Sequence, residues 1–477
     1  MRDFLPDDKA RREAVLGIIR HSFSGFGYRE IETPVAEALD RLESGDGGDN
    51  ARLIYRILRR GLDAGGSIPV SEAADLGLRF DLTVPLARFY ATHRAELPDV
   101  FRSIQVAPVW RAERPQRGRY RQFTQCDIDV VGEPSHLAEV ELITATAVTL
   151  SALGIEGTTV RINDRRLLHA LLAGCGFEGA ATAAVLIAVD KLDKVGVAGV
   201  EAELRAGGHP GAAVDRLVDF LATLPPGGGV EGARLPPTVP DGVTANLVAI
   251  TEAVAVAAPE VHVELDPSLV RGMGYYTGPI FEVAHPSATG SVAAGGRYDG
   301  MIGRFTGGDV PACGFSIGFE RVVDLVAGDR LPAGADAVAL LYGGGHDPGS
   351  LVRLQRRLAA GGRRVRLVRQ RNNTGRLLDD LASEGFGAYA VLAPGPVPDG
   401  AGRDAGVVLK PLARRPGGPP RGDGGPAGSR CYQPSGHAGE AAVTAPRDAG
   451  EAVVTAPRDA GEAVVTAPRD AGEAHPR

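Results

Sequence analysis

The chain has 477 residues, 44% of them hydrophobic, and carries a formal net charge of −7. Its length predicts two or three domains, and its negative charge excludes a uniformly basic nucleic-acid coat, so any RNA contact must come from local patches. Because the four cysteines form no C-x-x-C pair or zinc spacing, we expect reduced thiols and no metal ligands. The sequence shows neither a membrane-spanning apolar run nor a signal peptide, so we expect a cytoplasmic protein without membrane contact.

The first elements in chain order are a helix, a strand and a polar stretch. Apolar residues at helical spacing predict a helix from about Asp7 to Gly25, and Tyr28–Val35 alternates like an ordinary edge strand. The polar, glycine-rich residues Ser44–Gly77 are expected to contain loops.

A short strand running into a helix is predicted over Leu78–Pro85. Asp81 stands at the end of this strand and Thr83 near the N-cap of the helix. A carboxylate beside a hydroxyl suits either a helix cap or the binding of a substrate α-ammonium group. The residues alone favour the cap.

The stretch from Phe101 to Gly132 carries the strongest local signal. Ser103–Arg111 and Phe123–Val131 alternate between apolar and polar residues, which predicts two adjacent antiparallel strands. The loop between them contains the basic residues Arg114, Arg117, Arg119 and Arg121. Guanidinium groups bind phosphate oxygens in pairs. Gln125, Asp127 and Asp129 share one face of the second strand, which predicts a site for an amine-bearing ligand. The alternative is a solvated basic turn.

A helical module is expected after this hairpin. His136–Leu153 is typical of an amphipathic helix and Thr158–Asn163 of a strand. From about Asp164 to Thr244, Ala- and Leu-rich helical runs alternate with Gly/Pro segments, which indicates an insertion. Val261–Glu264 is a further short strand.

Two glycine-rich segments follow. Leu269–Gly278 places Arg271 among apolar residues and glycines and then pairs two tyrosines, before the strand Pro279–Ala284. Glycines let backbone approach a ligand closely, and tyrosines add hydroxyls to an apolar wall. Ala293–Gly300 is a glycine-rich strand end, and a strand at Gly314–Ile317 runs into a helix near Phe319. An arginine in the first turn of that helix suits an anion.

The last part of the chain has two different patterns. Strand-like and helical runs alternate from Ala335 to about Leu412, which predicts a small α/β domain with a largely parallel sheet. Its arginines suit RNA phosphates or a solvated strand edge. Beyond Arg414 an 11-residue unit, AGEAVVTAPRD, recurs with a proline and a glycine in every copy. These residues forbid a continuous helix, so we expect a disordered tail.

Several of these segments resemble one family. The run from Phe101 to Asp129, P-x-W-R-x-E-R-P-Q-x-G-R-Y-R-Q-F-x-Q-x-D-x-D, resembles motif 2 of the class II aminoacyl-tRNA synthetases in the form used by histidyl-tRNA synthetases. R-D-F-L-P at the N-terminus and R-F-D-L-T-V-P at Arg79–Pro85 resemble further signatures of that family. Tyr28–Val35 resembles motif 1, which builds the dimer interface in class II enzymes.

The segments beyond the insertion strengthen the resemblance. Arg271–Gly278 is similar to the histidine-specific signature R-G-L-D-Y-Y-T-G, with Met273 in place of Leu and Gly274 where the family usually has Asp. Pro311–Arg321 resembles motif 3, G-x-G-x-x-x-G-x-E-R.

The resemblance implies a set of site residues. Arg111 and Arg271 would stabilise the α-phosphate of ATP, and Arg321 would bind the γ-phosphate. The other implied ATP-binding residues are Glu113, Arg119, Arg121 and Phe123. The implied histidine-binding residues are Asp81, Thr83, Gln125, Asp129, Arg271, Tyr275, Tyr276 and Tyr298.

The resemblance also implies an architecture. It predicts an α+β fold, with an antiparallel class II sheet flanked by helices, a helical insertion and a C-terminal α/β domain resembling an anticodon-binding domain. The expected ranges are 1–163 and 245–330 for the catalytic core, 164–244 for the insertion, 335–412 for the α/β domain and 413–477 for the repeat tail.

The implied reaction is the activation of L-histidine by ATP and Mg²⁺, followed by transfer to the 3′ end of histidine tRNA by a homodimer. Two alternatives stay open. One is the regulatory paralogue that serves ATP phosphoribosyltransferase and binds histidine without aminoacylation. The other is a histidine-activating relative in specialised metabolism.

Overall fold

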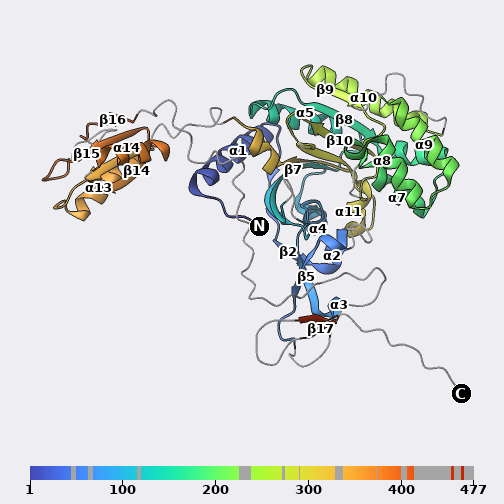
Figure 1. The fold of residues 1–477 in the computed structure, drawn as a ribbon, viewed down its shortest axis with the longest axis horizontal. Helices are drawn as coiled ribbons and strands as arrows, with labels where there is room; N and C mark the ends of the chain where they lie inside the picture. Colours follow the sequence, from blue (N-terminus) through green and yellow to red (C-terminus); the bar gives the residue numbers. More distant parts are fainter. Residues whose placement is uncertain are drawn as a thin grey trace. The chain divides into compact units, whose positions relative to one another are not determined.

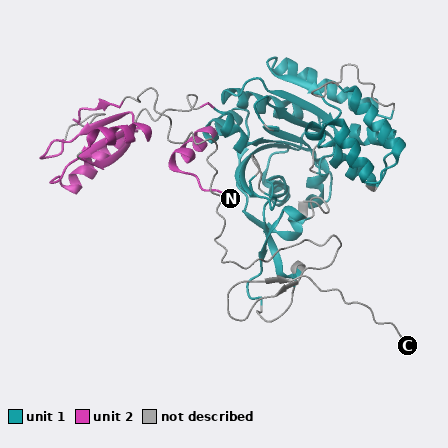
Figure 2. Cartoon of the chain, in the orientation of Figure 1, with its two compact units in different colours: residues 1, 16–326, 435–477 teal, residues 2–15, 327–434 magenta. Residues whose placement is uncertain are grey.

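The computed structural model describes residues 1–43, 50–62, 68–114, 120–224, 238–270, 274–288, 290–327, 337–371, 373–398, 406–412, 453–455 and 464–466. The chain divides into two compact units (Figure 2). One unit comprises residue 1 with 16–326 and 435–477, and the other comprises residues 2–15 with 327–434.

An eight-stranded sheet is the centre of the first unit (Figure 1). In spatial order its strands are β1 (Arg29–Glu30), β6 (Phe101–Trp110), β7 (Gln122–Val131), β12 (Ala312–Gly318), β11 (Ala293–Arg297), β10 (Pro279–Ala284), β8 (Thr159–Asp164) and β9 (His262–Leu265). The pairs β1–β6 and β8–β9 at the two edges are parallel, and every other pair is antiparallel. The predicted α+β class with an antiparallel core sheet is confirmed.

The β6–β7 hairpin matches its prediction to within two residues at each strand end. Phe101 pairs with Val131 and Trp110 with Gln122, so the register runs without a shift over both strands. Because side chains alternate along a strand, this register puts Gln125, Asp127 and Asp129 on one face of the sheet.

Helices pack on the sheet against apolar residues of its strands. Helix α4 (Thr83–His93) packs against α11 (Asp299–Thr306), and both belong to a buried cluster with Phe101 and Val131 of the hairpin. Helix α5 (Leu137–Ala152) packs on β7, β11 and β12, and its limits agree with the expected helix. Helix α12 (Phe319–Leu325) packs on β7 and β12. Helix α1 (Pro6–Gly25) has its residues 6–15 in the second unit and 16–25 in the first.

The inserted helices form a cluster of their own. They are α6 (Arg165–Cys175), α7 (Ala180–Val189), α8 (Leu192–Ala206) and α9 (Gly211–Thr223). Leucines and valines from all four helices bury one another. Helix α10 (Asp241–Ala257) crosses the expected boundary at residue 244 and packs on α5, β8 and β9. The assignment of 164–244 as a separate domain stays a prediction.

The segment between the first strand and α4 differs from its prediction. The expected strand Tyr28–Val35 is reduced to β1, and the N–H of Ile31 makes one further bond to β6, to the oxygen of Ile104 at 2.9 Å. Pro34, which lies in the part of the prediction that forms no strand, cannot donate a ladder hydrogen bond. The expected loop region forms a small antiparallel sheet, built from β2 (Ala36–Ala38), β5 (Ala74–Leu78) and β3 (Tyr55–Leu58). Short elements flank this sheet: α2 (Leu39–Glu43), η1 (Asn50–Leu53), β4 (Ile68–Pro69) and α3 (Val70–Ala73).

The second unit contains the predicted α/β alternation. Its elements are β13 (Ala337–Tyr342), α13 (Pro348–Ala360), β14 (Arg364–Arg369), α14 (Thr374–Ser383), β15 (Ala388–Val391) and β16 (Lys410–Pro411). Strands β14, β13 and β15 are parallel and β16 is antiparallel. Val338 and Leu340 of β13 bury residues of α13, whereas Ala339 and Leu341 bury residues of α14. The two helices therefore cover opposite faces of the sheet.

The repeat tail contributes two described strands. β17 (Val453–Thr455) and β18 (Val464–Thr466) are the same three residues of successive repeats, and they pair antiparallel with each other. β17 also pairs with β4. The other residues of 413–477 lie outside the described part, and the predicted disorder stays a prediction for them. No described helix has the length and apolar content that a bilayer span requires.

Candidate active site

A cavity of about 440 Å³ lies over the centre of the eight-stranded sheet. Its walls come from the β6–β7 hairpin, from β11 and β12, and from the first turn of α12. Many of the residues that the resemblance implied line it together. They are Thr83, Arg111, Glu113, Phe123, Gln125, Asp129, Tyr275, Tyr276, Tyr298 and Arg321.

The remaining implied residues are placed differently. Asp81 is buried behind the cavity wall. Arg121 is exposed, and its Nε donates to the backbone oxygen of Glu113 at 3.2 Å. Arg119 and Arg271 lie outside the described residues.

Two buried carboxylates of the cavity lining, Asp127 and Asp129, define what we term the carboxylate end. The buried Asp81, outside the lining, is a third carboxylate close enough for its charge to act on both. Tyr298 donates from its hydroxyl to Oδ1 of Asp129 at 2.5 Å. Burial raises the pKa of Asp129 to about 7 and that of Asp81 to about 6. Burial, with the neighbouring Asp129 charge, also raises the pKa of Asp127 well above its usual range. A cationic ligand would reverse these shifts, so this end is suited to an ammonium group.

Two acceptor atoms at this end are left for a ligand. Gln125 donates from Nε2 to Oδ2 of Asp127 at 3.2 Å and to the Ser316 hydroxyl at 3.3 Å. Its Oε1 and the Oδ2 of Asp81 are buried and find no hydrogen-bond partner among the described residues. Buried acceptors without partners are costly, so both atoms point to a donor supplied by a ligand.

Asp81 also settles how α4 begins. Its Oδ1 accepts from the backbone N–H of Val84 at 3.3 Å, whereas Thr83 is the first residue of the helix and the N-cap position, Leu82, has no side-chain cap. The capping role that the residues favoured therefore falls to one oxygen of Asp81, and its other oxygen stays available.

Three tyrosines form the wall beside these carboxylates. The rings of Tyr275 and Tyr276 lie 4.9 Å apart at 62°, and those of Tyr275 and Tyr298 lie 6.0 Å apart at 76°. Such edge-on pairs are favourable and hold each ring in place. Burial raises the pKa of Tyr275 well above its usual range, so this hydroxyl keeps its proton.

The floor of the carboxylate end is bare backbone. Gly314 lines the cavity, and a Cβ there would lie 2.0 Å from Oδ1 of Asp129. Gly296 does not line it, but a Cβ there would lie 2.9 Å from the ring of Tyr276, which does. No side chain larger than hydrogen fits either position.

We term the part of the cavity lined by Arg111 and Arg321 the arginine end; the Arg111 charge also reaches Asp81 and Asp127, whose pKa values it lowers. Nε of Arg111 donates to the backbone oxygen of Phe80 at 3.0 Å, and its guanidinium lies 5.0 Å from the centre of the Phe123 ring. Arg321 donates to the backbone oxygen of Ser291, and Glu320 beside it accepts from the N–H of Thr124 at 3.3 Å. Two guanidiniums and an aromatic face suit a nucleotide with its phosphates.

The cavity also contains residues that the sequence did not assign. Asp127 shared a face with two assigned residues but was left out of the histidine set. Ser316 alternates with Gly314 and Gly318 along β12, and that period of two was the signal that could have found it. Asp190 reaches the cavity from the end of α7, and no pattern in the sequence assigns it to this site.

An antiparallel sheet that carries an arginine-bearing hairpin, next to a strand that runs into a helix with an arginine in its first turn, is the architecture of the class II aminoacyl-tRNA synthetases. The sequence model of the family described as histidyl-tRNA synthetase matches residues 1–322. The chain belongs to the histidyl-tRNA synthetase family.

Individual relatives agree with this assignment. The histidine–tRNA ligase of Leifsonia xyli subsp. xyli is 55% identical over 407 residues, covering 82% of this chain and 93% of that protein. The histidine–tRNA ligase of Aeropyrum pernix is 42% identical over 328 residues, covering 68% and 72%. The solved histidyl-tRNA synthetase of Nostoc sp. PCC 7120 has a TM-score of 0.64 at 27% identity, covering 81% of this chain and 89% of that one.

A further structure shares the fold alone. It is an ATP phosphoribosyltransferase regulatory subunit/histidyl-tRNA synthetase from Bacillus halodurans, with a TM-score of 0.65 and 21% identity. The chain's high identity is with ligases, so the regulatory alternative is not favoured.

Proposed function

We propose that this protein is a histidine–tRNA ligase that activates L-histidine with ATP as histidyl-adenylate and transfers the histidyl group to the 3′ end of histidine tRNA. The observation that carries the proposal is 55% identity to such a ligase over 93% of its length. The cavity supports it, because carboxylates at one end and arginines at the other suit the two substrates of the first step.

In the first step a carboxylate oxygen of histidine attacks the α-phosphorus of ATP. A P–O bond forms, the bond to the β-phosphate oxygen breaks, and pyrophosphate leaves. Catalysis of this kind depends on positioning and charge stabilisation. Arg111 is oriented for the α-phosphate by its bond to the Phe80 oxygen, and Phe123 offers a face for adenine. Arg271 is proposed to share the α-phosphate, from the family signature alone.

The other nucleotide contacts are proposed as follows. Arg321 binds the γ-phosphate and exchanges the Ser291 oxygen for it. Glu113 orients the adenine amine, while Arg119 and Arg121 in the hairpin loop contribute positive charge near the phosphates. Mg²⁺ is proposed to enter with ATP, since it is usually bound through substrate phosphates and one or two carboxylates. Glu113 and Glu320 line the cavity where such carboxylates are needed, and Mg²⁺ would neutralise phosphate charge there.

Histidine is proposed to occupy the carboxylate end. Asp81 and Thr83 bind its α-ammonium group, which supplies the donor that Oδ2 of Asp81 lacks. Gln125 and Asp129 accept from the imidazole, and Tyr275, Tyr276 and Tyr298 enclose the ring.

The remaining features concern tRNA and assembly. Helices α6 to α9 are proposed to approach the acceptor arm, and the α/β domain at 335–412 the anticodon. A homodimer is proposed from the resemblance to motif 1. A cytoplasmic location follows from the proposed role in protein synthesis.

Histidine-dependent exchange of pyrophosphate into ATP tests the first step on the full-length protein, with and without Mg²⁺. Exchange with histidine alone among the amino acids supports the proposed pocket, and charging of histidine tRNA then supports the second step. Histidine binding without exchange would favour the regulatory paralogue. Exchange without charging would favour a specialised relative.

A further inference from the structure

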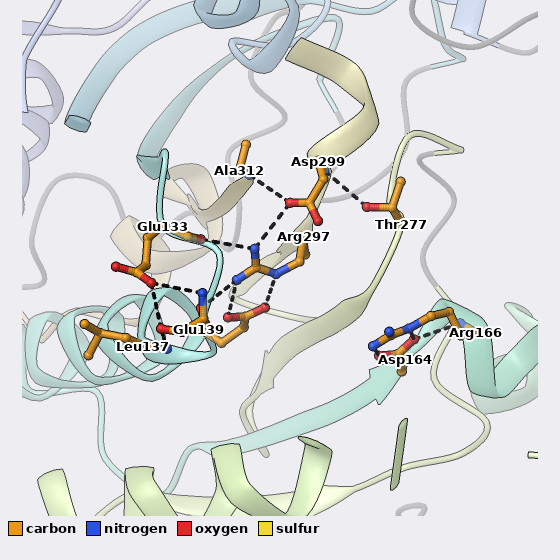
Figure 3. Close-up of polar contacts among 10 residues, drawn as sticks. Glu133, Leu137, Glu139, Asp164, Arg166, Thr277, Arg297, Asp299 and Ala312 are labelled. Atoms are coloured by element: carbon orange, nitrogen blue, oxygen red, sulfur yellow. Dashed lines mark hydrogen bonds and ion pairs between the residues drawn. The ribbon is translucent and has the colours of Figure 1, made fainter. Parts of the chain in front are cut away.

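Arg297, the last residue of β11, is a buried arginine directly before Tyr298. Its Nε and Nη2 donate to the two carboxylate oxygens of Glu139 on α5, at 2.6 and 2.7 Å. Nη2 also donates to the backbone oxygen of Ser135 at 2.9 Å, and Nη1 to that of Glu133 at 3.3 Å (Figure 3). The fork of the guanidinium therefore ties the end of β11 to the start of α5.

Asp299, on the other side of Tyr298, is fixed as well. Its Oδ1 accepts from the N–H of Ala312 at 2.8 Å and from Nη1 of Arg297 at 3.3 Å, and its own N–H donates to the Thr277 hydroxyl at 3.1 Å (Figure 3). The N–H of Tyr298 donates to the Ala312 oxygen at 2.7 Å. Both chain neighbours of Tyr298 and its own backbone are thus held by one polar network.

The side chain of Tyr298 connects this network to the cavity. The ring is fully buried, and its hydroxyl donates to Oδ1 of Asp129 at 2.5 Å. The ring also packs edge-on against Tyr275. A small shift at the end of β11 would move the hydroxyl away from Asp129. The network holds this backbone together with two further bonds, from the N–H of Thr277 to the Arg297 oxygen at 2.8 Å and from the N–H of Met301 to the Tyr298 oxygen at 3.0 Å.

A second ion pair on the same helix provides a comparison. Arg102 of β6 donates to both oxygens of Glu141 at 2.6 and 2.8 Å, with the same bidentate geometry. That pair is more exposed, and neither of its residues adjoins a residue that lines the cavity. Burying a charge pair is costly, and a buried pair is weak evidence for stability. The deeper burial of Arg297 and Glu139 therefore calls for another explanation.

We propose that the Arg297–Glu139 pair is a positioning device that sets the hydrogen bond from Tyr298 to Asp129 and thereby the recognition of histidine. The proposal rests on the proposed function for the identity of the ligand. Neither residue of the pair lines the cavity, so both act through Tyr298.

The test compares Glu139→Gln with Glu141→Gln, since both changes remove one carboxylate from the same helix. Pyrophosphate exchange gives the KM for histidine and for ATP. Glu139→Gln is expected to raise the KM for histidine by about tenfold, because small misplacements of a binding group are costly, and to leave the KM for ATP unchanged. Glu141→Gln is expected to leave both constants unchanged. Equal rises in both KM values, or equal effects of the two variants, would overturn the proposal.

A double-mutant cycle separates positioning from a general structural effect. If Glu139 acts through the Tyr298 hydroxyl, then Glu139→Gln combined with Tyr298→Phe is expected to be no weaker in histidine binding than Tyr298→Phe alone. Additive losses would show that Glu139 acts by some other route, and the positioning role would be wrong.

A milder variant guards against misfolding, because Glu139→Gln leaves a buried arginine without its counter-charge. Arg297→Lys keeps the positive charge but loses the fork. It is expected to raise the KM for histidine selectively, and thermal unfolding reports whether each variant is folded. Calorimetry of histidine binding tests the positioning role separately from the ligase activity. A wild-type protein that binds histidine but shows no exchange would contradict the proposed ligase. Selective loss of histidine binding in these variants would still support the positioning role.

Discussion

The carboxylate end of the cavity holds side chains that are hydrogen-bonded to one another, whereas the arginine end holds its cations against backbone oxygens. Asp129 is fixed by Tyr298, and Asp127 by Gln125. Arg111 and Arg321 instead donate to the carbonyls of Phe80 and Ser291. The carboxylate end is therefore pre-organised in the absence of ligand, and two of its acceptor atoms, Oε1 of Gln125 and Oδ2 of Asp81, have no hydrogen-bond partner among the described residues. At the arginine end, the phosphates of a nucleotide can replace the backbone oxygens as partners of the two guanidinium groups.

The comparison predicts different failures at the two ends. Loss of a group at the arginine end should reduce the rate of adenylate formation, because the charge on the phosphates develops in the transition state. Changes at the carboxylate end should first reduce histidine affinity. Five experiments test these expectations.

Replacing Arg111 with Ala is expected to give the largest effect. Removal of one transition-state donor costs about 10²–10³-fold in rate, and Arg111 also packs on the ring that we assign to adenine. Pyrophosphate exchange at saturating histidine measures the loss. Arg111→Lys should recover part of it, since charge is kept and the fork is lost. The exposed Arg94, outside the cavity, provides the control Arg94→Ala, and near-normal exchange by Arg111→Ala would remove Arg111 from the reaction.

Gly314→Ala tests the floor of the carboxylate end. The added Cβ would stand 2.0 Å from Oδ1 of Asp129, so this carboxylate has to move and its bond to Tyr298 breaks. We expect about a 10²-fold loss in kcat/KM for histidine, the usual scale for a misplaced reacting group. Gly300→Ala is the matched control, because a Cβ there meets only ordinary van der Waals contact. Equal activity of the two variants would contradict the crowded floor.

The pH dependence tests the buried charges. The pKa of Asp81 is raised to about 6 and that of Asp129 to about 7, so both carboxyls are neutral in acid and histidine affinity should rise with pH up to about 7. Where one of these groups is protonated, affinity should change by up to about tenfold per pH unit. Calorimetric titration from pH 5 to 8 measures this change. Asp129→Asn should flatten the upper part of the profile.

The sign is opposite for the stability of the ligand-free protein. Because the folded pKa values lie above the ordinary value of 3.8, the folded state binds more protons than the unfolded state between these values. The contribution of both groups is present below about pH 4 and is lost as the pH rises through 6 and 7. The free energy of unfolding of Asp129→Asn should fall less over this range than that of the parent. An equal fall in both proteins would contradict the raised pKa of Asp129.

Gly274→Asp should have the smallest effect. The histidine-specific signature that this segment resembles has Asp at this position. Gly274 is exposed and directly precedes Tyr275 of the tyrosine wall. Changes at exposed positions usually alter the free energy of unfolding by less than about 0.5 kcal/mol, so the fold should be kept. Because solvent screens an exposed carboxylate, we expect only about a twofold change in the KM for histidine. A change above tenfold would show that the missing carboxylate belongs to the histidine site.

The sequence predicted those parts of the fold whose signals are local. Strands β7 and β10 and helix α5 agree with their expected limits because alternation or helical periodicity is contained within each element. The β2–β5–β3 sheet was missed, since its strands are short and are held by distant contacts. Gly77, for instance, lies where a Cβ would meet Ile54 at 2.7 Å. No pattern within 44–77 reveals such a contact.

The site was predicted to the extent that it lies in motifs. The hairpin residues and the tyrosines came together as the resemblance implied. The place of Asp127 in the site depends on its hydrogen bond from the Gln125 amide. Asp190 lines the cavity because of where α7 ends. The role of Arg297 depends on a pairing with Glu139, which lies far away in sequence. These relations are three-dimensional, and no residue spacing encodes them.

The glycine floor limits how the cavity can be re-engineered. Position 314, which lines the cavity, already carries the smallest residue, and a Cβ there would collide with Oδ1 of Asp129. A pocket for a bulkier amino acid cannot be made by trimming this surface, because there is nothing left to trim. Altered substrate choice would have to come from the tyrosine wall or from the carboxylates, where a change in size also changes polarity. Enlarging the pocket and keeping its charge pattern are therefore opposed demands in this scaffold.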